Sequence, residues 1–368
     1  MEQIVLIASF LVPLVLSAVI FYNARGNTSK KILSLSMLNA AAVFIANYYY
    51  FIRDFEVYTF MHSAHVALVL FIYPSLYFYL EHLTGRLNLS KKMLIHLIPG
   101  FLFFILYFLS FDIKFSHAER TDFLNTYRNE LFANEEFRFI EWIRIINVAV
   151  IVLQVIYYST AIFIESHRYN MRVKNEFSNA ESLQIKWLSW FNMALIAVAI
   201  LSVLFYVVNP FSDANNTLLI VSMFAMSVFI WLIGIWGNAQ SAIKLPCEEA
   251  PEPRPDNNYE TLYAKLLESL ITEKLYLKPD LTLSELARTS GTNRTYASQA
   301  INAIYKGNFS SFVNAYRVKA AETLLKESPD LNMEIIAEQS GFGSVLTLER
   351  NFVKHIGISP GKIKKSLV

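Results

Sequence analysis

Polar and ionisable side chains are rare in the first 240 residues of the chain, so each raises the question of what chemistry it serves. Six stand within long apolar stretches: Asn39, Asn47, His62, His65, Gln154 and Asn192. Glu141 and Arg144 lie one helical turn apart near the outer end of the stretch that also contains Gln154. Inside a membrane, such groups can bind a ligand or relay protons. They can also form hydrogen bonds between helices or an ion pair within one helix, and we expect this simpler role for each.

Metal and enzyme chemistry are not indicated. His62 and His65 could share a helix face, but no carboxylate or cysteine partner accompanies them. Cys247 is the single cysteine, which excludes an intrachain disulfide and a multi-cysteine metal site. The sequence GFGS at 341–344 lacks the third glycine and the preceding strand of a dinucleotide-binding loop. We therefore expect no catalytic residue, no cofactor, no metal and no enzyme.

The elements that carry these side chains are long and apolar. Hydrophobic residues make up 54% of the chain and charged residues 17%, against about 25% charged residues in a typical soluble domain. Apolar stretches of roughly 19 residues or more can cross a hydrocarbon core of about 30 Å as helices. Seven of them predict a transmembrane bundle within residues 1–244, with spans at about 4–22, 32–52, 59–81, 93–111, 138–164, 187–208 and 217–237.

Other classes of membrane segment fit less well. The first span has no Lys or Arg before it, so we expect an uncleaved helix and not a signal peptide. The last span lacks the lysine that a retinal protein needs for its Schiff base. No span interior contains an aspartate of the kind that an intramembrane aspartyl protease requires.

Lysine and arginine mark alternate loops between the predicted spans. The loops after spans one, three and five are basic, whereas the loops between them are acidic or nearly free of basic residues. Basic loops remain on the cytoplasmic side of a membrane. We therefore expect a multi-pass protein of the inner (cell) membrane, with the amino terminus outside and the carboxyl-terminal part in the cytoplasm.

A proline-rich acidic linker, LPCEEAPEPRPDNN at 245–258, follows the last span. Proline removes a helical N–H and biases the residue before it toward extended geometry. The linker therefore predicts a boundary between the membrane domain and a second domain at 259–366.

Two stretches of this second domain repeat one pattern, LTLSELARTSG at 281–291 and LNMEIIAEQSGF at 331–342. In the first, Thr282 and Glu285 fit a capping box. Gly291 and Gly341 suit the left-handed turn of a helix-turn-helix, and Asn293 can cap the helix after the first turn. Because FSSFVNAYRVKAAETLLKE between them has the pattern of a long helix, the sequence predicts an all-α domain of two helix-turn-helix units joined by that helix.

Residues 259–366 resemble the DNA-binding domain of the AraC/XylS family. The residues that carry the resemblance are LSELARTSG, YASQAIN, GNFSSFVNAYRVKAAETLL and IIAEQSGFGSVLTLERNFVKHIGISP. Ala297 and Ile301 stand where larger Leu and Phe are usual, and Ile363-Lys364 replace the usual Tyr-Arg. The apolar half, with YPSLYFYLEHLTG followed by HLIPGFL, also resembles membrane-embedded AraC-type proteins.

The resemblance implies that one helix of each unit enters successive major grooves, about 34 Å apart along DNA. The expected DNA-binding residues face outward from these helices: Arg294, Thr295, Ser298 and Gln299 in the first, and Val345, Leu346, Thr347 and Arg350 in the second. Gln can read adenine, Arg guanine, and Ser or Thr either, whereas Val and Leu offer only apolar contact. Phosphate contacts are expected from Asn293, Lys354, Lys362 and Lys364, and core packing from Tyr296, Ile301, Leu348 and Phe352.

Together these features predict a membrane-bound, sequence-specific DNA-binding transcription regulator that senses a membrane or extracellular signal. The alternative is a seven-span receptor or transporter whose cytoplasmic tail is a protein-interaction module without DNA affinity. Expected partners are double-stranded DNA and membrane lipid, with RNA polymerase, a second copy of the chain and an unidentified signal ligand as further candidates.

Overall fold

The computed structural model describes residues 2–85, 92–125, 134–190, 192–193, 196–197, 199–200, 217–240 and 258–367. Within these residues every regular element is a helix, as predicted, and the one isolated β-bridge joins Phe177 to Thr282. The chain divides into two compact units. We call residues 1–167 with 185–244 the apolar unit, and residues 168–184 with 245–368 the carboxyl-terminal unit. Residues 168–184, assigned to the membrane domain from the sequence, thus belong to the second unit.

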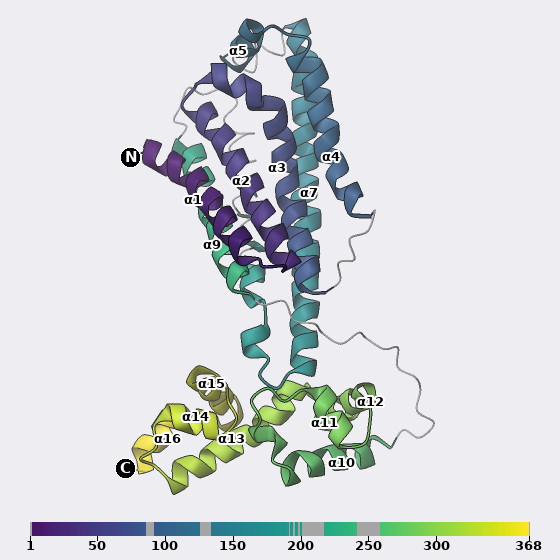
Figure 1. Cartoon of the computed structure of the whole chain (residues 1–368), viewed down its shortest axis with the longest axis vertical. Coiled ribbons are helices and arrows are strands. Elements are labelled where there is room, and N and C mark those ends of the chain that lie inside the picture. The colour runs from purple at the N-terminus through teal and green to yellow at the C-terminus, as the bar shows by residue number, and fades with distance from the viewer. Residues whose placement is uncertain are drawn as a thin grey trace. The chain divides into compact units, whose positions relative to one another are not determined.

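The apolar unit is built from long helices that pack in sequence order. α1 packs against α2, α2 against α3, α3 against α4, and α9 against α1 and α2 (Figure 1). The bounds of its elements are α1 (Glu2–Asn23), α2 (Thr28–Phe51), α3 (Phe55–Leu83), α4 (Lys92–Tyr107), the π-helical turn η1 (Phe108–Asp112), α5 (His117–Asn125), α7 (Glu135–Glu176) and α9 (Thr217–Ala239).

Five helices are long and apolar enough to cross a membrane, namely Gln3–Asn23, Thr28–Phe51, Phe55–Leu83, Met93–Asp112 and Phe137–Glu176. They overlap the first five predicted spans. The seventh predicted span falls on α9, which contains the shorter apolar helix Met223–Ala239. The sixth lies largely outside the described residues, as does nearly all of the linker, so the count of seven spans stays a prediction.

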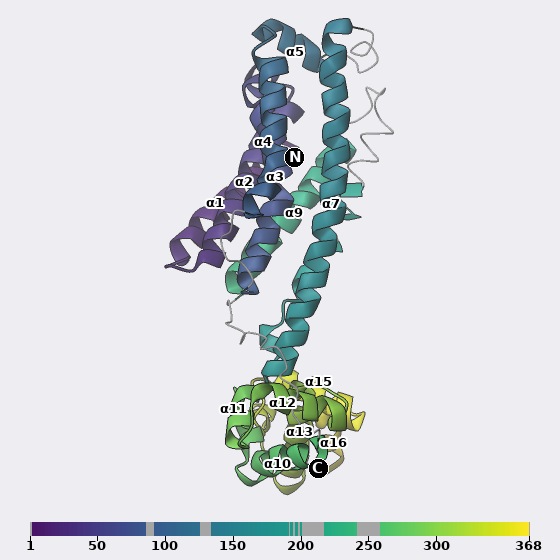
Figure 2. The same cartoon turned by 90° about the vertical axis from the view of Figure 1, so that its right-hand side faces the viewer.

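The helix α7 is much longer than the predicted span at 138–164. It runs for 42 residues without interruption, as Figure 2 shows. The apolar stretch ends near residue 164, but the following ESHRYNMRVKNE contains neither Gly nor Pro, so nothing in it breaks the helix. Basic residues expected in a loop, such as Arg168 and Lys174, therefore lie on a helix that enters the carboxyl-terminal unit.

Several polar side chains of the apolar unit hold helices together, as the simpler interpretation predicts. Asn39 of α2 donates to a backbone carbonyl of α3 (3.1 Å), and Asn192 donates to a backbone carbonyl of α7 (2.8 Å). Arg144 Nε donates to Glu141 Oε2 at 3.0 Å, and this carboxylate is fully buried. Among the described residues, no cluster with metal-ligand composition is present.

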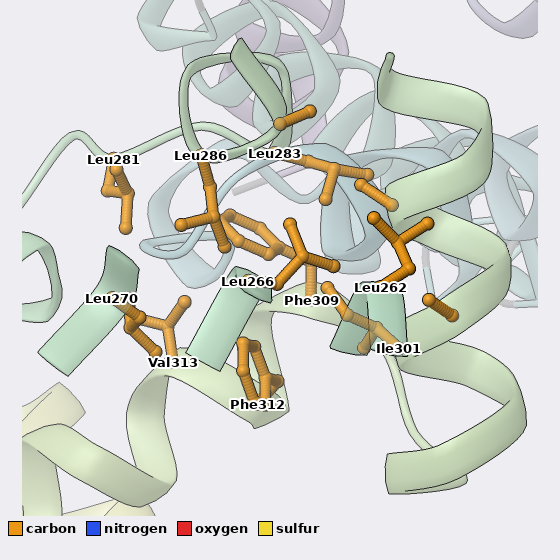
Figure 3. Close-up of a cluster of buried hydrophobic side chains, with 13 residues drawn as sticks. Leu262, Leu266, Leu270, Leu281, Leu283, Leu286, Ile301, Phe309, Phe312 and Val313 are labelled. Atoms are coloured by element: carbon orange, nitrogen blue, oxygen red, sulfur yellow. The ribbon is translucent and has the colours of Figure 1, made fainter. Parts of the chain in front are cut away.

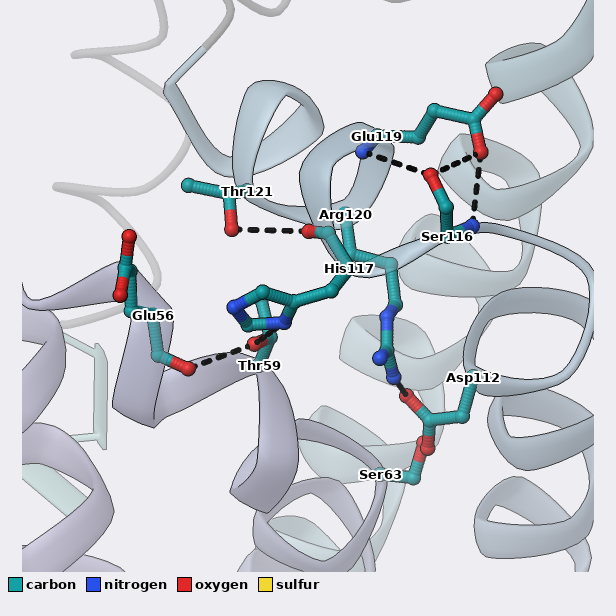
Figure 4. Close-up of polar contacts among 9 residues, drawn as sticks. All are labelled: Glu56, Thr59, Ser63, Asp112, Ser116, His117, Glu119, Arg120 and Thr121. Carbon is teal, nitrogen blue, oxygen red and sulfur yellow. Dashed lines mark hydrogen bonds and ion pairs between the residues drawn. The ribbon is translucent and has the colours of Figure 1, made fainter.

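One end of the apolar unit carries a polar network between α3 and the segment around α5 (Figure 4). Asp112 accepts hydrogen bonds from Ser63 Oγ (2.5 Å) and from Arg120 Nη1 (3.1 Å). Thr59 of α3 shares a hydrogen bond of 3.1 Å with His117, the first residue of α5. These contacts fasten α5 to α3.

The carboxyl-terminal unit is a set of short helices around α13. Its elements after the end of α7 are η2 (Glu181–Leu183), α10 (Tyr259–Thr272), η3 (Leu275–Leu277), α11 (Leu283–Thr289), α12 (Arg294–Ala300), η4 (Ile301–Tyr305), α13 (Phe309–Glu327), α14 (Met333–Gln339), α15 (Val345–Ile356) and α16 (Pro360–Leu367). α13 covers the residues predicted for the long joining helix, and α10–α12 and α14–α16 lie toward its opposite ends (Figure 1).

Two hydrophobic clusters form the core of this unit, and α13 contributes to both. The first gathers leucines of α10 and α11 around Phe309, Phe312 and Val313 of α13 (Figure 3). The second gathers side chains of α14 and α15, such as Leu348 and Phe352, around the later part of α13. Each helix-turn-helix is too small to enclose a core alone, so the shared helix completes both cores.

Candidate nucleic-acid interface

The two predicted helix-turn-helix motifs have the same backbone geometry. α11 and α12 meet at Gly291, and α14 and α15 meet at Gly341, with φ of +69° and +82°. In the first turn the amide of Thr292 donates to the carbonyl of Ala287 at 2.9 Å, and in the second the amide of Phe342 donates to the carbonyl of Ala337 at 2.8 Å. This is the hydrogen bond that ends a helix through a left-handed residue. The predicted repeat is therefore a structural duplication.

Side-chain caps start all four helices of the two motifs. The caps are Thr282, Asn293, Asn332 and Ser344, and each accepts a hydrogen bond from the backbone amide three residues later, at 2.8–3.2 Å. Such a cap stabilises a helix by about 1 kcal/mol. The predicted caps at Thr282 and Asn293 are confirmed, whereas the carboxylate of Glu285 pairs with Lys278 Nζ at 2.7 Å.

A buried arginine that sequence analysis missed joins α13 to η3 and to residue 178. Arg317 of α13 is completely buried, and its guanidinium donates to the carbonyls of Tyr276 (2.7 Å) and Lys278 (2.6 Å), to Ser178 Oγ (2.9 Å) and to Asn314 Oδ1 (3.2 Å). Burial lowers the pKa of Arg317 to about 10, so the group remains charged at neutral pH. The signal in the sequence was a lone arginine on the apolar stripe of α13, between Val313 and Ala321.

The residues expected to read DNA from the first motif lie together on α12. Arg294, Thr295, Ser298 and Gln299 are all half-buried. Gln299 Oε1 accepts a hydrogen bond of 3.4 Å from the hydroxyl of Tyr259. The expected core residue Ile301 is buried, as predicted, while Tyr296 packs partly buried against the first cluster.

The residues expected to read DNA from the second motif lie at the start of α15. Leu346 is 54% exposed, and the side chain of Arg350 is 59% exposed. Val345 is half-buried against the second cluster. Thr347 differs from its predicted outward position, because it is buried and its hydroxyl shares a hydrogen bond of 3.0 Å with Ser344 at the cap of the helix.

The expected phosphate contacts surround these two helices. Asn293 uses its side chain as the cap of α12. Lys354 Nζ donates to Ser311 Oγ at 3.2 Å, and Lys364 Nζ donates to a backbone carbonyl in the turn before α14 at 2.5 Å. Lys362 is exposed.

Both arginines among the expected DNA-binding residues are paired with acids from residues 168–184. Arg294 Nε donates to Glu176 Oε2 at 2.6 Å, and Glu176 is only 2% exposed. Arg350 Nη1 donates to Glu181 Oε2 at 3.2 Å. Neither pairing was expected from the sequence, because these acids precede the arginines by more than a hundred residues.

Residues 286–366 match the model of a family described as a helix-turn-helix domain. This region is an AraC-type helix-turn-helix domain. The match supports the resemblance to the AraC/XylS family over 286–366, where the matching domain is a DNA-binding regulator domain. The comparisons with curated proteins and with solved structures give no significant match.

The apolar unit contains a cavity of about 860 Å³. Its walls come from α2, α3, α7 and α9 and from Asn192, Met193, Ile196, Ala199 and Ile200, and they are mostly aliphatic and aromatic. Tyr73, Ser159 and Asn192 line this cavity, and each has a buried polar atom (Tyr73 Oη, Ser159 Oγ and Asn192 Oδ1) with no hydrogen-bond partner among the described residues. A mainly apolar cavity with a few convergent polar groups is the usual form of a small-molecule site.

Proposed function

We propose that the protein is a membrane-bound, sequence-specific DNA-binding transcription regulator, in which the apolar unit senses a signal and the AraC-type domain binds DNA. The observation that carries the proposal is the presence, on one polypeptide, of apolar helices of membrane-spanning length and of a duplicated helix-turn-helix. Because the sensing part and the DNA-binding part are on one chain, no separate phosphotransfer protein is needed to connect them.

The chemistry of the two candidate recognition helices supports sequence-specific DNA binding. α12 offers Arg294 and Gln299, whose forked side chains suit guanine and adenine. α15 offers an apolar start at Leu346 followed by Arg350. The first helix would therefore read hydrogen-bonding edges, and the second would combine thymine methyl contact with one charged contact.

The apolar unit supports the sensing role through its cavity. An unsatisfied buried hydroxyl or amide destabilises a protein by about 1–3 kcal/mol. Tyr73, Ser159 and Asn192 line the cavity, and each holds such a buried group. A lipid-soluble molecule with a hydrogen-bonding head would satisfy these groups once their side chains rotate toward the cavity, while its apolar body fills the remaining volume.

Selection of DNA by the fragment 258–367 tests the proposal against the rival, a receptor or transporter with a protein-binding tail. Both hydrophobic clusters lie inside this fragment. We expect a random duplex library to yield an enriched sequence with two half-sites about one helical turn apart. Affinity for it should fall steeply with salt, because phosphate contacts release counterions. No enrichment together with salt-independent binding would favour the rival.

A further inference from the structure

Residues 176–181, which we call the bridging segment, lie across both helix-turn-helix motifs within the carboxyl-terminal unit. At its start, Glu176 accepts hydrogen bonds from Arg294 Nε (2.6 Å), from Ser284 Oγ (2.7 Å) and from the Ser284 backbone amide (3.4 Å). Arginine, serine hydroxyls and backbone amides are the donors that proteins use for DNA phosphates. The Glu176 carboxylate thus occupies donors of the kind that a phosphate would take.

The centre of the bridging segment is buried in the unit. Ser178 has no exposed surface, and its amide donates to the carbonyl of Leu281 at 3.0 Å. Its carbonyl accepts from Ser310 Oγ at 2.9 Å, and its hydroxyl accepts from Arg317 at 2.9 Å. Phe177 forms the antiparallel bridge to Thr282. The segment is therefore held by specific backbone and side-chain bonds, not by charge alone.

The end of the bridging segment reaches the second motif. Glu181 accepts from Arg350 of α15 at 3.2 Å. Asn179 lies beside Gly343, in the turn before α15, where a Cβ added at Gly343 would be 3.3 Å from Asn179 Cγ. One short stretch of chain thus touches the first residue of one recognition helix and the turn and an exposed arginine of the other.

We propose that the bridging segment and DNA compete for this surface, so that the structure represents a DNA-free, autoinhibited form. The inference rests on the proposed function, because it names the regulation of the same DNA-binding site. Arg294 and Arg350 cannot give the same hydrogen bonds to a carboxylate and to DNA. Two carboxylates on the DNA-facing side would also repel the phosphate backbone.

The competition provides a route from the apolar unit to DNA affinity. When a protein binds DNA only in its undocked form, the apparent affinity equals the intrinsic affinity multiplied by the fraction of the protein that is undocked. Glu176 is the last residue of α7, and residues 151–163 of the same helix line the cavity. A ligand that changes α7 would therefore act directly on the helix that carries Glu176.

Charge-neutral substitutions in the full chain test the competition. The probe is the duplex selected by the fragment 258–367, and the protein is held in lipid nanodiscs. Glu176→Gln with Glu181→Gln should bind this duplex about tenfold more tightly than the wild type, because the charge-assisted bonds that hold the segment are weakened. The matched control, Glu268→Gln with Glu327→Gln, removes the same charge from exposed positions on α10 and α13 and should change affinity less than twofold.

A reversible crosslink supplies a second test that does not depend on charge. Asn179→Cys with Gly343→Cys, in a Cys247→Ser background, can form a disulfide, since Asn179 Cγ, which stands where a cysteine sulfur would lie, is 3.3 Å from a Cβ added at residue 343. The oxidised protein should lose at least nine-tenths of its binding to the selected duplex, and reduction should restore it. Unchanged binding after verified oxidation would overturn the inference.

The outcomes separate the two proposals. Equal affinity of the wild type, the double glutamine variant and the control would refute the competition but leave DNA binding intact. A fragment that selects no duplex would refute the proposed function and the inference with it. Tighter binding by the double glutamine variant alone, with redox-controlled binding of the crosslinked form, supports both.

Discussion

Gly341, in the turn between α14 and α15, lies directly against the backbone of Leu277 in η3. A Cβ at residue 341 would be 2.8 Å from Leu277 Cα and 2.7 Å from the carbonyl oxygen of Tyr276. The glycine is also in the left-handed region. This contact sets the second motif against the part of the chain that leads into the first, so the relation of the two motifs depends on the absence of a side chain here.

Gly341→Ala should therefore destabilise the carboxyl-terminal unit by about 2–4 kcal/mol, through backbone strain and overpacking together. Gly291→Ala is the matched control. That residue has the same left-handed conformation, but no neighbouring atom lies within 4 Å of the added Cβ, so only about 1–2 kcal/mol is expected. Hydrogen exchange of the α14 and α15 amides in the full chain measures the difference. Equal protection in the two variants would contradict the packing argument.

Replacement of Arg317 should have a larger effect than replacement of an exposed arginine. Arg317→Met fills a similar volume but leaves several buried acceptors, among them the carbonyls of Tyr276 and Lys278, without a donor. Removing one side of such a buried charged network costs about 3–5 kcal/mol. Arg288→Met, at an exposed position on α11, should cost less than about 0.5 kcal/mol. Denaturant unfolding of the fragment 258–367, which lacks the bridging segment, measures the contribution of the Arg317 contacts other than the one with Ser178.

The sequence predicted the features that depend on local patterns. Apolar runs predicted the first five long helices, and the recurring glycines at 291 and 341 predicted the two turns, because each feature is encoded within about twenty residues. The family match rests on the same local patterns. Caps such as Asn293 followed from residue type and position.

Features that join distant parts of the chain were not predictable. The length of α7 depends on the absence of a helix breaker after residue 164, whereas hydropathy indicates only where its apolar part ends. Thr347 was placed outward by analogy, but the pairing of its hydroxyl with Ser344 turns it inward. The contacts of Glu176 and Ser178 with the helix-turn-helix domain connect residues more than a hundred positions apart. The periodic patterns of apolar residues in the sequence give no information about such contacts.

Base-reading residues should show sequence-dependent effects. Gln299→Ala and Arg350→Ala in the fragment 258–367 should each weaken binding to the selected duplex by about 1–3 kcal/mol if they contact bases. They should affect a scrambled duplex much less. Lys326→Ala, at an exposed position on α13, is the control and should leave both affinities nearly unchanged. Equal losses on selected and scrambled DNA would reassign the residue to a phosphate contact.

The substitution Tyr73→Phe at the cavity of the apolar unit should change the thermal midpoint in opposite directions for an empty and an occupied cavity. If it is empty, Tyr73→Phe removes an unsatisfied buried hydroxyl and should raise the thermal midpoint of the protein purified in detergent. If a ligand from the membrane bonds to the hydroxyl, the same change should lower the midpoint of protein purified without delipidation. Our proposal predicts the second result. Val69→Ala, an apolar change at the same cavity, controls for packing.

The single cysteine makes the membrane topology directly measurable. Cys247 follows the last predicted span, so a cytoplasmic carboxyl-terminal unit requires that a membrane-impermeant maleimide label it only after the cells are permeabilised. The reference is Ala118→Cys in a Cys247→Ser background. Residue 118 is an exposed position of α5, in a loop that the charge pattern places outside, and it should react in intact cells. Labelling of Cys247 in intact cells would place the helix-turn-helix domain on the side of the membrane away from the chromosome, where it could not act on DNA.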